Sequence, residues 1–549
     1  MAYEPESPFR SPIVGDLNLS QPGPAPGSEP GSPPGLMLRA VEEVDPEQQV
    51  PMLIELNLRY PGGLQVVRDE FYALWERYAG RSRGQWPDEV TSGSHVQPEV
   101  PPGLALVAPK LYQTVLSRAD LGELVEDDRR SAARTGRPPT VFRVWPDYLL
   151  HPQIDRSAPT VKANAAWRAY DARGSGIVWA VIDSGIDATH PHFAGLELAA
   201  EGRGEDLPQG RTSGLHRDFS FLVNPADPVA QPPGGAAAGA PASPLVDDSG
   251  HGTHVAGIIA GCTPDGMTPR VATPDEPGDG GFVARAGADR LSGMAPACEL
   301  VSIKVMRLSS QGTYVTSSSA VIRALTYLRT EVNVDPAVLR VHGVNMSLGC
   351  EWRPDQYAAG QSPLCQAVGQ VVASGVVVVV SAGNFGARST SRDTADTSAV
   401  MGSITEPAHT EDCIAVGSTH REAPHAFGVT WTSGKGPTLD GRMKPDVVAP
   451  GEWIASAASG KVRATAGLTP APGDPLPASL LTYAEQSGTS MAAPHVSGVI
   501  AAFLSARPEF IGRPQQVKSL LTASATDLGR ERYAQGAGLV DLMRMLANV

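Results

Sequence analysis

Three short segments of the sequence contain residue types that could carry out nucleophilic catalysis. Asp183 stands at the end of an apolar run that is typical of a buried strand. Residues 250–254 (GHGTH) place His251 between glycines, directly before an apolar stretch. Residues 487–495 (SGTSMAAPH) contain Ser490 four residues before a proline. A carboxylate, an imidazole and a hydroxyl are the three groups that activate a serine nucleophile.

Each segment alone has an alternative explanation. Asp183 could be a turn residue that ends a strand. His251 and His254 could form a metal pair, although no third ligand follows at a recognisable zinc spacing. Ser490 could cap a helix, because Pro494 is acceptable in the first turn of a helix, where backbone N–H groups lack intrahelical partners. That position would also place Ser490 at the positive end of a helix dipole.

Taken together, the three residues are the parts of a nucleophilic triad. Serine is a poor nucleophile until a base takes its proton, and the base needs a carboxylate to hold its tautomer and stabilise the imidazolium. Residues 381–384 (SAGN) add Asn384 after another apolar strand, where its amide could donate to an oxyanion. The segment 434–436 (GKG) is not a phosphate-binding loop, because the spacing of the upstream glycine is wrong.

The segments that hold these residues predict a parallel α/β sheet. Nearly continuous apolar strands alternate with helices, as expected where both faces of a sheet are covered. Residues beyond the carboxyl ends of such strands form the sites of these folds. The predicted strands are 176–182, 300–306, 341–346, 376–382 and 414–416, and the predicted helices include 315–329 and 364–374. Two Pro/Gly/Ala-rich insertions, about 198–246 and 262–291, are interpreted as surface loops.

A smaller α+β unit precedes this sheet. Its pattern is β-α-β-β-α-β, the order of a ferredoxin-like split βαβ domain. Ser117 and Asp120 resemble the start of a capping box that opens the second helix. The predicted strands are 52–58, 104–108, 110–116 and 140–145, and the helices are 67–78 and 117–130. Residues 1–36, rich in Pro, Gly and Ser, are predicted to be a disordered tail.

Composition narrows the class of function. The chain has 549 residues, and 44 Lys+Arg against 58 Asp+Glu give 44 − 58 = −14, which argues against nucleic-acid binding. The longest apolar run is too short to span a bilayer, and the N-terminus shows no secretory signal. We therefore expect a cytoplasmic protein without membrane contact. Cys350 and Cys365 are close enough in sequence to pair, but reduced thiols are the expectation in that compartment.

The sequence resembles the subtilisin family (subtilases) of serine peptidases. The order Asp, His, Ser along the chain is the subtilisin order. The resemblance extends over about residues 160–549 and implies a subtilisin-like three-layer α/β fold. It rests on the segments VIDSGID (181–187), GHGTHVAGIIAG (250–261), SLG (347–349), SAGN (381–384), KPDVVAPG (444–451), SGTSMAAPHVSG (487–498) and GLVD (538–541).

The resemblance implies a role for each matching residue. Ser490 is the nucleophile, His251 the general base and acid, and Asp183 the orienting carboxylate of a serine endopeptidase. Asn384 and the backbone N–H of Ser490 form the oxyanion hole. The substrate backbone binds as an added strand, and Phe385 makes the primary pocket apolar. The implied substrate-binding residues are Gly312, Tyr314, Ser347, Leu348, Gly349 and Gly383.

Two departures from the family concern the insertions. Asp183 and His251 are 68 residues apart, a wide separation caused by the 198–246 insertion, which could gate the cleft. The 262–291 insertion lies where some relatives carry a calcium loop, and its acids Asp265, Asp275, Glu276 and Asp279 form no ordered ligand pattern. Catalysis requires no cofactor, and a structural calcium ion stays an open question.

The resemblance also suggests a role for the small N-terminal unit. The chain divides into a tail (1–36), a propeptide-like inhibitory or regulatory domain (37–150) and a peptidase domain (151–549). The expected partners are a polypeptide substrate, the N-terminal domain as an intramolecular inhibitor, and an activating or regulatory protein. Self-cleavage is expected near Leu149–His151. The alternatives are a permanent regulatory domain and, for the whole chain, a catalytically silent subtilase fold used for binding.

Overall fold

The computed structural model divides the chain into two compact units. The described residues up to Pro146 belong to the first unit, and those from Leu149 onward belong to the second. The predicted tail, 1–36, lies outside the described residues. Those residues are 49–84, 100–146, 149–152, 159–196, 198, 212, 214–223, 243–274, 282–286, 291–335, 338–351, 357–389, 397–468 and 480–549.

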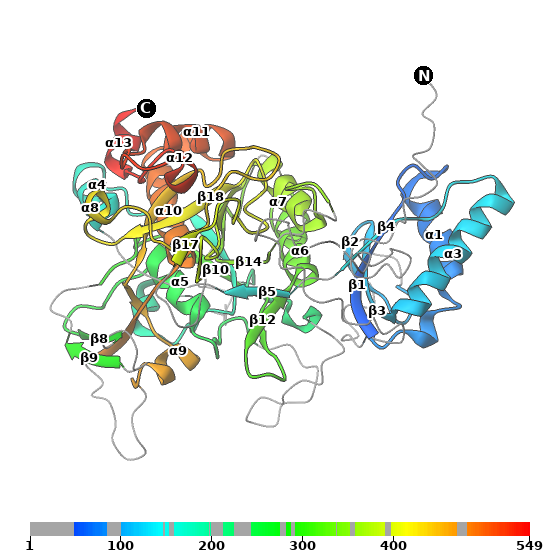
Figure 1. The fold of residues 1–549 in the computed structure, drawn as a ribbon. Coiled ribbons are helices and arrows are strands. Elements are labelled where there is room, and N and C mark those ends of the chain that lie inside the picture. The colour runs from blue at the N-terminus through cyan, green and yellow to red at the C-terminus, as the bar shows by residue number, and fades with distance from the viewer. Residues whose placement is uncertain are drawn as a thin grey trace, which may run out of the picture. The chain divides into compact units, whose positions relative to one another are not determined.

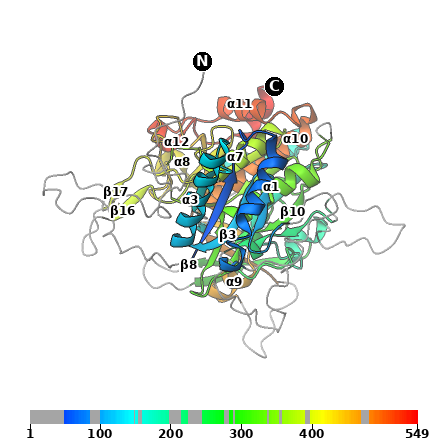
Figure 2. The same cartoon turned by 90° about the vertical axis from the view of Figure 1, so that its right-hand side faces the viewer.

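The first unit is a four-stranded antiparallel sheet with two helices, as the sequence predicts. The strand order is β2-β3-β1-β4, and β1 pairs with both β3 and β4. Figure 2 shows the two helices side by side on one face of that sheet. The elements are β1 (Gln49–Leu56), α1 (Gly63–Trp75), β2 (Ala105–Ala108), β3 (Leu111–Ser117), α3 (Arg118–Thr135) and β4 (Val141–Pro146).

Apolar residues at strand and helix spacing form the core of the first unit. Alternate residues of β1, including Met52 and Ile54, pack against Phe71 and Trp75 of α1. The Ser117 hydroxyl accepts a hydrogen bond from the Asp120 N–H at 3.0 Å, so it caps α3 as predicted. The helix extends to Thr135, beyond the predicted end at residue 130. The strands and helices of this unit therefore follow from local sequence patterns, namely the spacing of apolar residues and the helix cap.

The second unit contains a seven-stranded parallel sheet, which confirms the predicted α/β fold. The strand order is β19-β18-β15-β13-β6-β10-β7, and every neighbouring pair is parallel. The strands are β6 (Val178–Asp183), β7 (Arg217–Asp218), β10 (Glu299–Lys304), β13 (Gly343–Met346), β15 (Val377–Ser381), β18 (Ile414–His420) and β19 (Val447–Glu452).

Helices cover both faces of this sheet and complete three layers. Helices α5 and α10 pack on one face, where they form a large apolar core with Trp179, Val379 and Val416 (Figure 1). Helices α6 and α7 pack against each other, and α7 packs against β15. The helices are α4 (Ala163–Tyr170), α5 (His251–Ile259), α6 (Ser318–Tyr327), α7 (Pro363–Ala373), α8 (Pro424–Phe427), α9 (Gly460–Thr465), α10 (Thr489–Ala506), α11 (Pro514–Ser524), α12 (Arg532–Gln535) and α13 (Leu542–Ala547).

The interpretation of residues 262–291 as a surface loop is wrong. Two strands of this segment, β8 (Thr268–Pro274) and β9 (Phe282–Ala286), continue a sheet with β20 (Ile454–Ala457) and β21 (Leu480–Gln486), in the order β20-β21-β8-β9. The Pro and Gly content concealed strands whose partner β21 lies about 200 residues away. The other insertion lies largely outside the described residues.

One further detail corrects the sequence analysis. The predicted helix 315–329 begins as strand β12 (Tyr314–Ser317), and α6 starts only at Ser318, where Ser317 caps it. Helix α10 is long and apolar enough to cross a membrane by length and composition, but 89% of it is buried inside the protein, as in the core helix of a globular domain. All five cysteines are free thiols.

Candidate active site

Asp183 and His251 meet at the carboxyl edge of the parallel sheet. Asp183 is the last residue of β6, and His251 is the first residue of α5. Asp183 Oδ1 lies 2.6 Å from His251 Nδ1, and both side chains are buried. A second donor, the Ser184 N–H, reaches the same oxygen at 2.7 Å. Because an ionised carboxylate only accepts hydrogen bonds, this pairing places the proton on Nδ1 and leaves Nε2 able to accept one.

Asp247 holds the first turn of α5 in place, and the sequence analysis did not identify it. Its Oδ1 accepts from the Ser184 hydroxyl and the Gly250 N–H, each at 2.8 Å. Its Oδ2 accepts from the N–H and the hydroxyl of Thr253, at 2.8 and 2.7 Å. One buried carboxylate therefore joins the residue after Asp183 to the start of the helix that carries His251.

Ser490 lies in the first turn of α10, but Pro494 is not in that turn. The helix starts at Thr489, so Pro494 is its sixth residue. A proline has no N–H, so the carbonyl of the residue four positions earlier, Ser490, lacks its helical partner. The Ser347 hydroxyl donates to that carbonyl at 2.6 Å, and the Ser490 hydroxyl donates to the Ser347 carbonyl at 3.1 Å. The two serines are thus held by a reciprocal pair of bonds.

A buried chain of side chains fixes Ser347 in turn. Asn345 on β13 donates from Nδ2 to the Ser347 hydroxyl at 2.9 Å. Its Oδ1 accepts from the hydroxyl of Ser497, on α10, at 2.9 Å. Asn345 is completely buried within an otherwise apolar strand. A polar residue in such a run was the available signal for this network, because a buried amide needs partners.

Asn384 faces the same end of α10. Its Oδ1 accepts from the Thr489 N–H at 3.0 Å and from the Thr489 hydroxyl at 3.1 Å. That hydroxyl also accepts from the Gly383 N–H at 3.1 Å. These bonds fix which way the amide is turned and leave its Nδ2 as a donor beside the residue that precedes Ser490.

A small antiparallel sheet lies beside these residues. Strand β5 (Leu149–Pro152) pairs on one side with β12 and on the other with β14 (Leu348–Gly349), in a sheet of order β11-β12-β5-β14 that begins at β11 (Arg307–Leu308). Thr316 is opposite Leu150, Gly349 is opposite His151, and Leu348 is opposite Pro152. The segment that ends the predicted N-terminal domain is therefore bound, backbone to backbone, by Leu348, Gly349 and their neighbours.

Two further predicted substrate residues, Gly312 and Tyr314, belong to the β11–β12 hairpin of this sheet. Gly312 is exposed in the turn between β11 and β12, and Tyr314 starts β12. Burial and the nearby Asp248 and Asp247 raise the pKa of Tyr314 to about 12.

Two glycines in this region have no room for a side chain. A Cβ on Gly349 would lie 2.7 Å from Thr405 Oγ1, and one on Gly383 would lie 2.6 Å from Thr405 Cγ2. Thr405 therefore fills the space behind both glycines. Phe385, which follows Asn384, is 43% exposed.

A buried carboxyl group lies directly behind β14. Glu406 exchanges two backbone hydrogen bonds of 3.0 Å with Cys350, the residue after Gly349. Its side chain is almost fully buried near Tyr357, Ser362 and Cys365, and its Oε1 has no hydrogen-bond partner among the described residues. Burial raises the pKa of Glu406 to about 7, although these three neighbours oppose the shift.

The described part of the chain contains no cluster of metal-binding side chains. No group of three or more His, Cys, Asp or Glu side chains in that part could hold a metal ion. Nε2 of His254, considered above as half of a metal pair with His251, lies 2.9 Å from the Ala484 carbonyl oxygen. Of the four acids noted in the 262–291 insertion, only Asp265 lies among the described residues, so the calcium question stays open.

Comparison with known proteins finds a matching family model and several similar sequences. Residues 174–539 match the model of the subtilase family. The chain is 27% identical to subtilisin E of Bacillus subtilis over 419 residues, which are 76% of this chain and 78% of that protein. It is 28% identical to subtilisin Savinase of Lederbergia lenta over 368 residues (67% and 90%), and 30% identical to subtilisin DY of Bacillus licheniformis over 296 residues (54% and 77%).

The four bonds to Asp247 predict a large effect of Asp247→Asn on folding. An amide accepts hydrogen bonds at its oxygen but not at its nitrogen. The two donors that face the nitrogen of the new side chain therefore lose their acceptor. We expect the free energy of unfolding to fall by about 2–3 kcal/mol. Urea denaturation in a Ser490→Ala background measures it. Asp187→Asn is the control, since that carboxylate accepts locally from Thr189, and equal losses in the two variants would contradict the assignment.

The raised pKa of Glu406 predicts a stability that falls as pH rises. Between the ordinary pKa of about 4.5 and about 7, the folded protein binds more protons at this site than the unfolded chain, so stability decreases with pH across that window. Glu406→Gln should remove the effect, which is on the order of 3 kcal/mol. Thermal unfolding from pH 5 to pH 8, again with Ser490→Ala, compares the two proteins. Identical pH dependence in both would refute the prediction.

Proposed function

The chain belongs to the subtilase family, and on that premise we propose that it is a serine endopeptidase. The observation that carries the proposal is the hydrogen bond between Asp183 and His251 at the edge of the sheet where Ser490 also lies. Its substrate would be a polypeptide, and the reaction needs no cofactor because the chain supplies every reacting group.

The proposed reaction proceeds through an acyl-enzyme. The Ser490 oxygen attacks the carbonyl carbon of the scissile bond while His251 Nε2 takes the hydroxyl proton. The imidazolium is stabilised by Asp183 and gives this proton to the leaving amine as the C–N bond breaks. Water then attacks the ester, loses a proton to His251, and releases the carboxyl product, with the proton returned to Ser490.

The tetrahedral intermediates need donors for their oxyanion. The Nδ2 of Asn384 and the N–H of Ser490 are the proposed donors, because Thr489 fixes the amide oxygen and the helix start leaves its first N–H groups without intrahelical partners. The dipole of α10 adds a favourable field at the same end.

The proposed substrate binds as an extended strand between β12 and β14. Strand β5 already occupies this place with antiparallel pairing on both sides, and this pairing supports the assignment. We propose that β5 and the N-terminal domain hold the enzyme in check as a zymogen until the strand is cut or displaced by an activating protein. The alternative of a catalytically silent fold would require that none of these groups act chemically.

Replacement of the nucleophile tests the chemistry. Ser490→Ala should lower kcat on a denatured protein substrate by about a million-fold, the scale known for removing a subtilisin-type triad. A fluorophosphonate probe should label the wild-type protein and leave the variant unlabelled. Peptidase activity that persists in the purified variant would overturn the proposal, and a wild-type protein that neither labels nor cleaves, with or without β5, would favour the silent fold.

The register of β5 predicts where self-cleavage would occur. Pro152 is opposite Leu348 in the antiparallel pairing of β5 with β14. The residue before Leu348 is Ser347, whose carbonyl accepts the hydrogen bond from the Ser490 hydroxyl. We therefore propose that the bond that is cut lies after Pro152, downstream of the Leu149–His151 region expected from sequence. N-terminal sequencing of the wild-type protein should find a chain that starts beyond residue 152, while Ser490→Ala stays whole. A start at or before His151 would contradict this register.

A further inference from the structure

Lys435 is a buried lysine whose ammonium group, among the described residues, donates to backbone oxygens alone. Its Nζ donates to the carbonyls of Gly386, Trp431 and Ser433 at 3.1, 2.8 and 3.0 Å, and the residue is 9% exposed. An ammonium has three donors, so this set uses all of them. The three carbonyls come from two segments that are about 45 residues apart in sequence, and Lys435 joins them.

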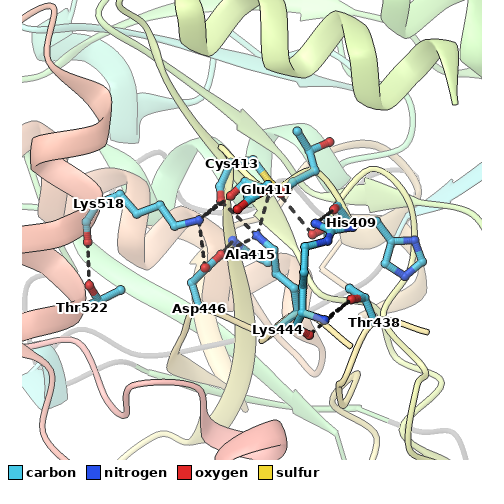
Figure 3. Close-up of polar contacts among 12 residues, drawn as sticks. His409, Glu411, Cys413, Ala415, Thr438, Lys444, Asp446, Lys518 and Thr522 are labelled. Carbon is cyan, nitrogen blue, oxygen red and sulfur yellow. Dashed lines mark hydrogen bonds and ion pairs between the residues drawn. The ribbon is translucent and has the colours of Figure 1, made fainter. Parts of the chain in front are cut away.

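This arrangement differs from that of three other lysines of the same unit, the buried Lys304 and Lys444 and the partly buried Lys518. Each of these three lies within ion-pair distance of a carboxylate, which for Lys304 is Asp248 at 3.8 Å. Lys444 and Lys518 both reach the carboxylate of Asp446, at 2.7 and 2.9 Å, as well as the Cys413 carbonyl (Figure 3). No carboxylate lies within ion-pair distance of Lys435 in the described part of the chain. Burial accordingly lowers the pKa of Lys435. A buried charge without a counter-ion is costly, so stability alone does not explain a lysine at this position.

The segment that Lys435 holds contains Asn384. Gly386 is two residues after Asn384, and its N–H also donates to the Thr432 carbonyl at 2.9 Å. At the other end of the segment, the Gly383 carbonyl accepts from the Gly434 N–H at 2.6 Å. Residues 383–386 are therefore fastened at both ends to residues 431–435.

The contact between these two segments is unusually close. A Cβ on Gly386 would lie 1.8 Å from the Ser433 carbonyl oxygen and 2.6 Å from Lys435 Nζ. The carbonyl oxygens of Gly386 and Ser433 both lie within hydrogen-bond distance of Lys435 Nζ, so two partial negative charges converge at this point. The ammonium between them offsets the repulsion that would otherwise push the segments apart.

We propose that Lys435 is a positioning residue for the oxyanion donor: its ammonium fixes residues 383–386 against residues 431–435 and so holds Asn384 where its Nδ2 meets the developing charge. This inference rests on the proposed peptidase function. Thr489 orients the amide oxygen of Asn384 from one side, and Lys435 fixes the backbone from the other. Neither contact touches the substrate.

The test replaces the ammonium by an apolar group of similar length. Lys435→Met should lower kcat by about 10-fold to 100-fold, since a misplacement near 1 Å can cost about 10²-fold, while KM changes little. Lys518→Met is the control, because it removes a partly buried lysine that binds two carbonyls and Asp446 away from residues 383–386. Rates are expressed per site titrated with the fluorophosphonate probe, so that only folded enzyme is counted.

A double-mutant cycle with Asn384→Ala separates positioning from general damage. Asn384→Ala alone should cost about 10²–10³ in kcat. If Lys435 acts through Asn384, then Lys435→Met should add less than threefold in that background. Additive losses in the cycle, or a kcat loss in Lys518→Met as large as that in Lys435→Met, would overturn the inference.

These experiments distinguish a failure of the proposed peptidase function from a failure of the proposed role of Lys435. Activity retained by Ser490→Ala, or kcat unchanged in Asn384→Ala, would remove the proposed function itself. If those variants behave as expected and Lys435→Met keeps full kcat, only the role of Lys435 falls. Lys435→Gln guards against a misfolded methionine variant, because its amide can donate to two of the three carbonyls, and it should retain more kcat than Lys435→Met. The reverse order would also count against the inference.

Discussion

The missing N–H of Pro494 is the constraint on which the candidate site depends. It frees the Ser490 carbonyl inside a helix that is otherwise regularly bonded, and the Ser347 hydroxyl takes the vacant place at 2.6 Å. The reciprocal bond from Ser490 to the Ser347 carbonyl then ties the candidate nucleophile to the segment that pairs with β5. A buried carbonyl without a partner would cost about 1–3 kcal/mol, so the proline and the serine have to be considered together.

The parallel sheet explains why residues so distant in sequence meet at this point. Strands β15, β13 and β6 are neighbours in the sheet, and the chain leaves their carboxyl ends at the segments that contain Asn384, Ser347 and Asp183. Helices α5 and α10 pack on the same face and bring His251 and Ser490 to that edge. The sheet therefore sets the positions coarsely. Buried polar contacts, through Asp247, Asn345 and Lys435, then set them finely.

Much of this arrangement could be predicted from sequence, and what could not be predicted has a common cause. Strand and helix patterns located the sheet of the first unit and the parallel sheet of the second, and the glycine-flanked motifs located Asp183, His251 and Ser490. The 262–291 segment was misjudged because β8 is defined by pairing with β21, a long-range contact that composition does not reveal. Asp247 and Lys435 were missed for the same reason, since a carboxylate that caps a helix and a lysine that binds carbonyls are recognisable only when their partners are known. Lys435 is the middle residue of the segment 434–436 (GKG), whose glycine spacing does not fit a phosphate-binding loop.

Strand β5 adds a kinetic consequence to this geometry. Its pairing with β12 and β14 fills the place proposed for a substrate strand, and it does so within the same chain. An intramolecular strand acts at an effective concentration in the millimolar range when its connection is short and flexible, so an external peptide of ordinary affinity competes poorly with it. The proposed cut after Pro152 would turn this segment into a chain end that can separate from β12 and β14. Control of such an enzyme would therefore lie in the lifetime of four residues of backbone pairing, while the Ser490 hydroxyl donates to the Ser347 carbonyl at 3.1 Å.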